Sequence, residues 1–332
     1  MTSCLPIQYS EMKQPAVLCR RNCFSGVTSP LCVSLSGLRL SRGFVSLPEV
    51  RGYSVKMDVG ARTDMGRVRD NNEDAYRIEP SLGLYVISDG MGGEAHGELA
   101  SNLAVETIVE HCQASLSDPS APSLGETRPD LSPRTNRLAG AVYLANQRIY
   151  DSGERNLEQR GMGATVVAAW IEGQDLSLAH VGDSRAYLLR AGALEQITAD
   201  HSLVAEQVRQ GLITPQQAES SELQNVLTRA LGPHSEIGID ADEHVLLPGD
   251  TLLMCTDGVS RMVTDEEIAS TLMTSMSAQQ SADRLIELAN ENGGVDNSTA
   301  IVIRMIPEPD GLLDKFKRWR QGDGAATAGD AI

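Results

Sequence analysis

The chain has 332 residues, 41% of them hydrophobic, and carries a formal net charge of −17. This length and hydrophobic content suffice for one large domain or two small ones with a well-packed core. The acidic balance argues against binding to a nucleic-acid backbone, which requires clustered Lys and Arg. No apolar run approaches the roughly 18 residues that suggest a membrane span, so we expect no integral membrane contact.

Residues 1–53 differ in composition from the remainder. The first 56 residues carry seven basic and two acidic side chains, so residues 57–332 carry a net charge of −22. The segment is rich in Ser, Leu and Arg and lacks the sustained apolar stretch of a secretory signal. We expect 1–53 to be either a disordered leader or upstream sequence that precedes a true start at Met57; an organelle-targeting segment is the alternative.

The six cysteines show neither zinc-ligand spacing nor a disulfide framework. We therefore expect a reducing compartment and a cytoplasmic location. The cysteines are Cys4, Cys19, Cys23 and Cys32 in the leader, and Cys112 and Cys255 in apolar contexts.

From residue 54 onward, strand-like runs alternate with segments of helical periodicity. Thr264 with Glu267, and Ser277 with Gln280, are capping patterns that predict two further helix starts. The short spacing between strands favours antiparallel pairing with helices outside, an α+β layered fold. The expected strands are 54–60, 75–79, 84–88, 163–172, 175–182, 185–190, 237–247, 250–256 and 299–306, and the expected helices are 94–114, 132–158, 201–210 and 215–219.

Residues 308–332 contain the basic sequence LLDKFKRWRQ followed by Gly and Ala. We expect a flexible, solvated end, as chain termini usually are. Contact with an acidic membrane surface or a partner is the alternative.

Three apolar runs each deliver an aspartate into a glycine-containing turn: LYVISDGMGG ends at Asp89, LSLAHVGDSR at Asp183 and TLLMCTDGVS at Asp257. A single Asp-Gly is most often a simple turn. Three copies after core-like strands instead suggest that the fold brings the carboxylates together. Oxygen ligands suit Mg²⁺ or Mn²⁺, and a cation offsets the cost of burying clustered charges.

An ordered set of eight blocks resembles the bacterial branch of the PP2C-type (PPM) metal-dependent protein Ser/Thr phosphatases. The resemblance covers roughly residues 57–305 and implies a central sandwich of two antiparallel β-sheets flanked by helix pairs, with a dinuclear Mn²⁺ or Mg²⁺ site. The blocks are VRDNNEDAY (68–76), VISDGMGG (86–93), GMGATVVAA (161–169), HVGDSRAYLLR (180–190), DHSLVAEQVRQGLIT (200–214), NVLTRALG (225–232), LLMCTDGV (252–259) and GGVDNSTAIVI (293–303).

Carried over by position, the resemblance implies a role for each of eight residues. Asp89 bridges both metals, and Gly90 supplies a carbonyl ligand. Asp257 and Asp296 are the remaining ligands of one metal, and Glu73 contacts the other metal through a water. Asp183 is the ligand of a third, more weakly bound ion. Asp74 orients the attacking water and Arg69 grips the substrate phosphate; these two are the predicted catalytic residues.

Three departures from the family pattern stand out. Met91 occupies the position of a His that protonates the leaving group in eukaryotic members, although bacterial relatives commonly carry Met there. Residues 218–224 lack the His-Pro and basic residue typical of the flap beside the site, which leaves substrate preference open. His96 is slightly offset from a His common in relatives; we expect a surface residue at a helix start, with a role in the site as the alternative.

The resemblance predicts a signalling hydrolase that dephosphorylates phosphoserine and phosphothreonine in proteins and opposes a Ser/Thr protein kinase. We expect a monomer with no nucleic-acid partner. One alternative is a catalytically inactive PP2C-like binding or regulatory module; such relatives usually lose a metal ligand, whereas Asp89, Asp257 and Asp296 are all present. A second alternative keeps the hydrolase but directs it at anti-sigma antagonist proteins.

Overall fold

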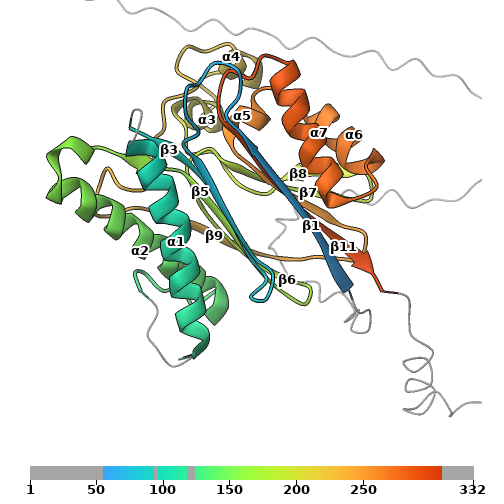
Figure 1. Ribbon diagram of the computed structural model, residues 1–332, viewed down its shortest axis with the longest axis horizontal. Coiled ribbons are helices and arrows are strands. Elements are labelled where there is room, and N and C mark those ends of the chain that lie inside the picture. Colours follow the sequence, from blue (N-terminus) through green and yellow to red (C-terminus); the bar gives the residue numbers. More distant parts are fainter. Residues whose placement is uncertain (1–54, 93–95, 118–123, 309–332) are drawn as a thin grey trace, which may run out of the picture. The chain divides into compact units, whose positions relative to one another are not determined.

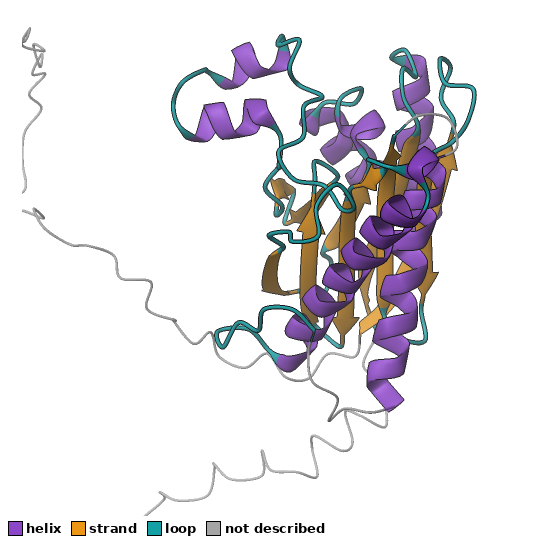
Figure 2. Ribbon diagram, turned by 90° about the vertical axis from the view of Figure 1, so that its left-hand side faces the viewer, coloured by secondary structure: helices purple, strands orange, loops and turns teal. Residues whose placement is uncertain are grey.

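The computed structural model describes residues 55–92, 96–117 and 124–308 of the chain. Within these ranges the strands form two antiparallel β-sheets, and helices cover the outer face of each sheet (Figures 1 and 2). The predicted α+β sandwich is therefore confirmed. The predicted leader lies outside the described residues, as does the predicted tail except for Glu308.

One sheet has the strand order β1-β11-β10-β7-β8, and the other the order β2-β3-β5-β6-β9 with β4 paired to β3. The bounds in the first sheet are β1 (Val55–Asp64), β11 (Ser298–Pro307), β10 (Thr251–Cys255), β7 (Arg185–Arg190) and β8 (Ala193–Gln196). Those in the second are β2 (Asp74–Glu79), β3 (Leu84–Met91), β4 (Gly163–Ala164), β5 (Val166–Glu172), β6 (Asp175–Val181) and β9 (Asp240–Val245). The helices are α1 (His96–Ser117), α2 (Pro133–Arg155), α3 (Leu203–Arg209), α4 (Pro215–Glu219), α5 (Asp257–Ser260), α6 (Asp265–Thr274) and α7 (Ala278–Glu291), with a 3₁₀ turn η1 at Leu157–Gln159.

The continuous apolar runs of the central strands follow from burial on both faces. In β5, Val167 and Ala169 point into the sandwich, where they pack with residues of the opposite sheet such as Ile301. Their neighbours Val166 and Ala168 point the other way and pack beneath α1 and α2. Since successive side chains of a strand alternate between faces, both sets must be apolar. A third cluster joins the other sheet to α6 and α7.

The predicted helix starts are confirmed at both capping patterns. At α6 the Glu267 N–H donates to Thr264 Oγ1 (3.3 Å), and the Thr264 N–H donates to the Glu267 carboxylate (3.0 Å). At α7 the Gln280 N–H donates to Ser277 Oγ (3.2 Å), but the Gln280 side chain accepts from Met276 instead of from Ser277. The first pattern is thus a complete capping box and the second only half of one.

Two elements were not predicted. Strand β8 extends the hairpin after β7 at the edge of its sheet. Helix α5 begins at Asp257, where the sequence suggested only a turn. The backbone of α5 packs tightly against the backbone at Asn297. A Cβ on Gly258 would lie 2.0 Å from the Asn297 carbonyl oxygen, so this position has no room for a side chain. The helical turn brings the residue four positions after Asp257 back to the same side, which matters for the site below.

Residues 203–226, hereafter the flap segment, contain α3 and α4 and lie at one end of the sandwich (Figure 1). Its base is closed by two backbone hydrogen bonds: the Leu203 N–H donates to Val226 (2.8 Å), and the Thr228 N–H donates to His201 (2.8 Å). Among the described residues, no helix has the length and apolar character needed to cross a membrane.

Candidate metal centre

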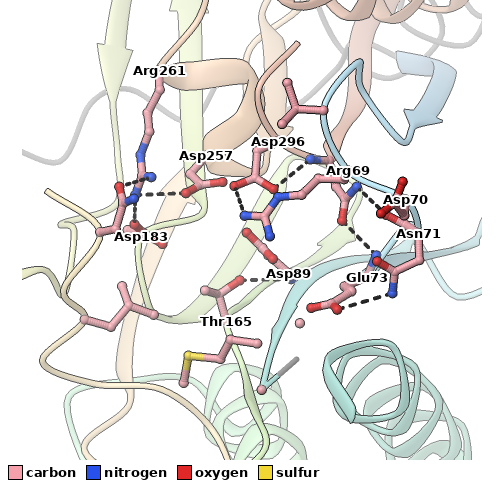
Figure 3. Close-up of a pocket in the computed structure, with 17 residues that line it drawn as sticks. Arg69, Asp70, Asn71, Glu73, Asp89, Thr165, Asp183, Asp257, Arg261 and Asp296 are labelled. Atoms are coloured by element: carbon pink, nitrogen blue, oxygen red, sulfur yellow. Dashed lines mark hydrogen bonds and ion pairs between the residues drawn. The ribbon is translucent and has the colours of Figure 1, made fainter. Parts of the chain in front are cut away.

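Six acidic side chains line one cavity of about 760 Å³, and five of them are the predicted metal ligands (Figure 3). Asp89 lies near the end of β3, Asp183 follows β6, Asp257 begins α5, and Glu73 and Asp296 lie just before β2 and β11. All five were predicted from the sequence. The cavity is lined by Val68, Arg69, Asp70, Asn71, Glu73, Asp89, Gly90, Met91, Gly92, Thr165, Asp183, Asn225, Leu227, Asp257, Arg261, Asp296 and Asn297.

Asp74 lies beside this cavity and not in its lining. The antiparallel register places it directly opposite Asp89 on the neighbouring strand, so both side chains leave the same face of the sheet. One oxygen of the Asp74 carboxylate accepts hydrogen bonds from the hydroxyls of Thr256 (2.9 Å) and Thr299 (2.6 Å). The other oxygen, Oδ1, is buried and has no hydrogen-bond partner among the described residues.

Two glycines allow the close approach of α1 to the site. A Cβ on Gly90 would lie 2.0 Å from the carbonyl oxygen of Gly97, and a Cβ on Gly97 would lie 2.1 Å from Oε2 of Glu73. Neither position has room for a side chain. The glycines therefore place the Glu73 carboxylate next to the Gly90 backbone, as the predicted pair of oxygen ligands requires.

The clustered carboxylates resist ionisation in this environment. Burial raises the pKa of Asp89 well above its ordinary value, and the charges of Asp74, Asp257 and Asp183 raise it further. Burial raises the pKa of Asp74 to about 7, although the two threonine hydroxyls oppose the shift. The pKa of Asp183 also rises to about 7, through burial and then repulsion from Asp257, while Arg261 opposes the change. Burial raises the pKa of Asp257 as well. A bound cation would relieve these costs.

The donor set fits hard divalent cations. Oδ1 of Asp257 is buried without a hydrogen-bond partner in the described part of the chain, as Oδ1 of Asp74 is. Buried polar atoms rarely stay unpaired unless a ligand or ion completes them. Carboxylates and a backbone carbonyl suit Mg²⁺ or Mn²⁺, whereas zinc sites recruit Cys or His. Asp89, Gly90, Asp257, Asp296 and Glu73 are the residues that would hold such ions.

Arg69 reaches the same cavity from the loop before β2 (Figure 3). Its Nη2 donates to Oδ2 of Asp296 at 2.8 Å, and its side chain remains 52% exposed. This ion pair fixes one end of the guanidinium at the cavity wall. The remaining donors of the planar group stay available to an incoming anion.

Several polar residues of the site were missed by the sequence reasoning. Thr165 Oγ1 accepts the backbone N–H of Asp89 (3.0 Å) and so fixes the strand that carries this carboxylate. Asn297 Oδ1 accepts the backbone N–H of Glu73 (2.8 Å), and its Nδ2 donates to the carbonyls of Met65 and Asn71. Asn297 thereby holds the loop that carries Arg69. Its position directly after Asp296 in GGVDNS was the available signal.

Arg261 is the most consequential residue that the sequence reasoning missed. Its Nη2 lies 2.8 Å from Oδ2 of Asp183 and 2.8 Å from Oδ2 of Asp257. The available signal was an Arg four residues after Asp257, the spacing of neighbours on a helix. This spacing is informative only on a helix, whereas the sequence predicted a turn at Asp257.

The histidines stay outside the cavity lining. His96 begins α1. His180 is buried and stacks on His201 with ring centroids 4.9 Å apart. His201 Nδ1 accepts the N–H of Gly182 (3.1 Å), and its Nε2 lies 3.2 Å from the Asp240 carboxylate. This buried cluster supports the turn that carries Asp183.

The comparisons with known proteins agree with this geometry. The family model described as protein phosphatase 2C matches residues 66–292, so the chain belongs to the protein phosphatase 2C family. A serine/threonine phosphatase stp of Listeria welshimeri is 34% identical over 245 residues, which are 73% of this chain and 93% of that protein. The serine/threonine protein phosphatase PstP of Mycobacterium tuberculosis is 39% identical over 246 residues, which are 74% of this chain and 44% of that protein.

Solved structures show the same fold. The crystal structure of the Mycobacterium tuberculosis phosphatase PstP/Ppp matches with a TM-score of 0.67 and 37% identity, over 76% of this chain and 99% of that chain. A structure of the PstP catalytic domain in complex with two manganese ions matches with a TM-score of 0.64 and 37% identity, over the same shares.

Proposed function

We propose that this chain is a metal-dependent protein phosphatase that hydrolyses phosphoserine and phosphothreonine in proteins. The observation that carries the proposal is the convergence of Asp89, Asp257, Asp296 and the Gly90 backbone on one cavity that Arg69 also lines. Family membership and the manganese-containing relative support a dinuclear Mn²⁺ or Mg²⁺ centre. Phosphorylated proteins are the substrates.

Each residue of the site has a distinct part in this proposal. Divalent cations held at this site would supply an acidified water and neutralise phosphate charge. Asp89, Asp257 and Asp296 would hold these cations together with Glu73 and the Gly90 carbonyl. Arg69, anchored through Asp296, presents its planar donors to the phosphate oxygens and orients the phosphorus for in-line attack.

Orientation of the attacking water is assigned to Asp74. Its Oδ2 is held by Thr256 and Thr299, which leaves Oδ1 as the open acceptor. This open oxygen can accept a hydrogen bond from the attacking water and so orient it. Met91 lines the cavity but has no proton to donate, so the leaving oxygen would take its proton from a water held in the site.

The biological setting is part of the same proposal. We assign catalysis to residues 54–307, which contain the matched region and both sheets. The enzyme would act as a cytoplasmic monomer and oppose a Ser/Thr protein kinase. Residues 218–224 of the flap segment would influence which phosphoproteins are accepted.

Metal removal tests the proposal directly. EDTA treatment should abolish turnover of p-nitrophenyl phosphate and of a phosphothreonine peptide, and added Mn²⁺ should restore both. Asp257→Asn is the matched variant, since it keeps the side-chain volume and removes one anionic ligand. Full activity after exhaustive chelation would contradict the dinuclear assignment, and no activity with Mn²⁺ on any phosphoprotein would favour an inactive binding module.

A further inference from the structure

The guanidinium of Arg261 occupies the space between two carboxylates of the centre (Figure 3). Nη2 contacts both Asp183 and Asp257 at 2.8 Å, although Asp183 and Arg261 are 78 residues apart. All three side chains are largely buried, with exposed fractions of 23% for Arg261, 8% for Asp183 and 11% for Asp257. Two nearly buried carboxylates facing each other are costly to ionise without a cation, and the chain itself provides one.

The flap segment holds the guanidinium from its other side. Nη1 donates to Oδ1 of Asn225, and Nη2 also lies 3.5 Å from the carbonyl oxygen of Gln224. The backbone adds a further restraint, because the Arg261 N–H donates to the carbonyl of Asp257 (2.9 Å). A guanidinium with four oxygen acceptors cannot leave without breaking contacts on both sides of the cavity.

We propose that Arg261 is a built-in cation that takes the place of a third divalent ion between Asp183 and Asp257. The proposal rests on the proposed dinuclear function and specifies its metal content. Arg stays charged at any working pH, so a change in pH does not remove the positive charge from this position. A third ion would have to displace the guanidinium or lie against its positive charge, and either arrangement weakens its binding.

The charges of the site are consistent with this content. Seven carboxylates lie in or beside the cavity: Asp70, Glu73, Asp74, Asp89, Asp183, Asp257 and Asp296. Two divalent cations together with Arg69 and Arg261 compensate all but one of these charges. A third divalent ion would leave the site with excess positive charge before any phosphate arrives.

Metal stoichiometry tests the proposal independently of catalysis. Isothermal titration with Mn²⁺ and metal analysis after equilibrium dialysis should give two ions per chain for the wild type and for Arg261→Lys, which keeps a cation. Arg261→Ala should bind a third ion at least about tenfold more tightly than the wild type does, a difference of about 1.4 kcal/mol. Adding Asp183→Asn to Arg261→Ala should remove the third ion again.

Arg284→Ala is the matched control, because it removes one positive charge from α7, where Arg284 pairs with Glu287 and Glu291. It should bind two ions, which separates a local effect from a change in net charge. Three ions in the wild type, or only two in a folded Arg261→Ala, would overturn the role of Arg261. Absence of any Mn²⁺ binding in the wild type would overturn the proposed function and this inference with it.

Discussion

The metal-free protein should lose stability as the pH rises from 6 to 8. Burial and like charges raise the pKa of both Asp74 and Asp183 to about 7 in the folded chain. In the unfolded chain these carboxyls ionise near pH 4. Between these values the folded state binds more protons, so raising the pH removes protons from the folded state only and lowers the free energy of unfolding.

The size of the effect follows from the shifted values. For one group with a folded pKa of about 7, the passage from pH 6 to pH 8 costs about 1.4 kcal/mol of unfolding free energy. Two such groups give about 2–3 kcal/mol. For a domain of this size, 1 kcal/mol corresponds to roughly 2–4 °C in melting temperature, so the expected fall is about 5–10 °C.

Thermal denaturation at pH 6 and pH 8, in EDTA and in Mn²⁺, measures this effect. Mn²⁺ binds the ionised carboxylates, so its stabilisation should be larger at pH 8 than at pH 6. Asp74→Asn should lose roughly half of the fall seen in EDTA. This variant isolates the share of one carboxylate.

Asp130→Asn is the control, since Asp130 is exposed and Arg128 lowers the pKa of its carboxyl. It should leave the pH dependence unchanged. Equal stability of the metal-free wild type at pH 6 and pH 8, or an unaltered fall in Asp74→Asn, would refute the argument that buried carboxylate repulsion governs this centre.

Three further predictions concern single residues and the chain ends. Asp257→Asn should fold but lose roughly 10³ in rate, or about 4 kcal/mol of transition-state stabilisation; retention of more than about a tenth of the wild-type rate would exclude it as a primary ligand. Arg69→Ala should lower kcat/KM for a phosphopeptide by roughly 10- to 150-fold through loss of a charge-assisted contact, with Mn²⁺ affinity in titration nearly unchanged. Weakened Mn²⁺ binding with normal kinetics at saturating metal would instead place Arg69 in the structural support of the site. A chain beginning at Ser54 should keep its melting temperature and turnover, because both sheets are complete from Val55 onward; a fall of many degrees would show that residues 1–53 pack on the domain.

Local sequence was enough to determine the layers of this protein. Strands covered on both faces, such as β5, need continuous apolar runs, and such runs are visible without any partner. The capping box at Thr264 and Glu267 fixes a helix start within four residues. Glu73, Asp89, Gly90, Asp183, Asp257 and Asp296 were found as candidate ligands through ordered blocks in the sequence, and the fold gathers all of them at one cavity.

The tertiary structure alone decided how those charges are compensated. It places Asp74 beside the cavity. One carboxylate oxygen accepts hydrogen bonds from two threonines, and the other has no hydrogen-bond partner among the described residues. It also turns the chain after Asp257 into helix α5, which brings Arg261 onto Asp183 and Asp257. Sequence patterns report apolar periodicity and local turns. The partner of a buried charge depends on which distant segments the folded chain packs against each other, and that information appears only once the sheets and the flap segment are in place.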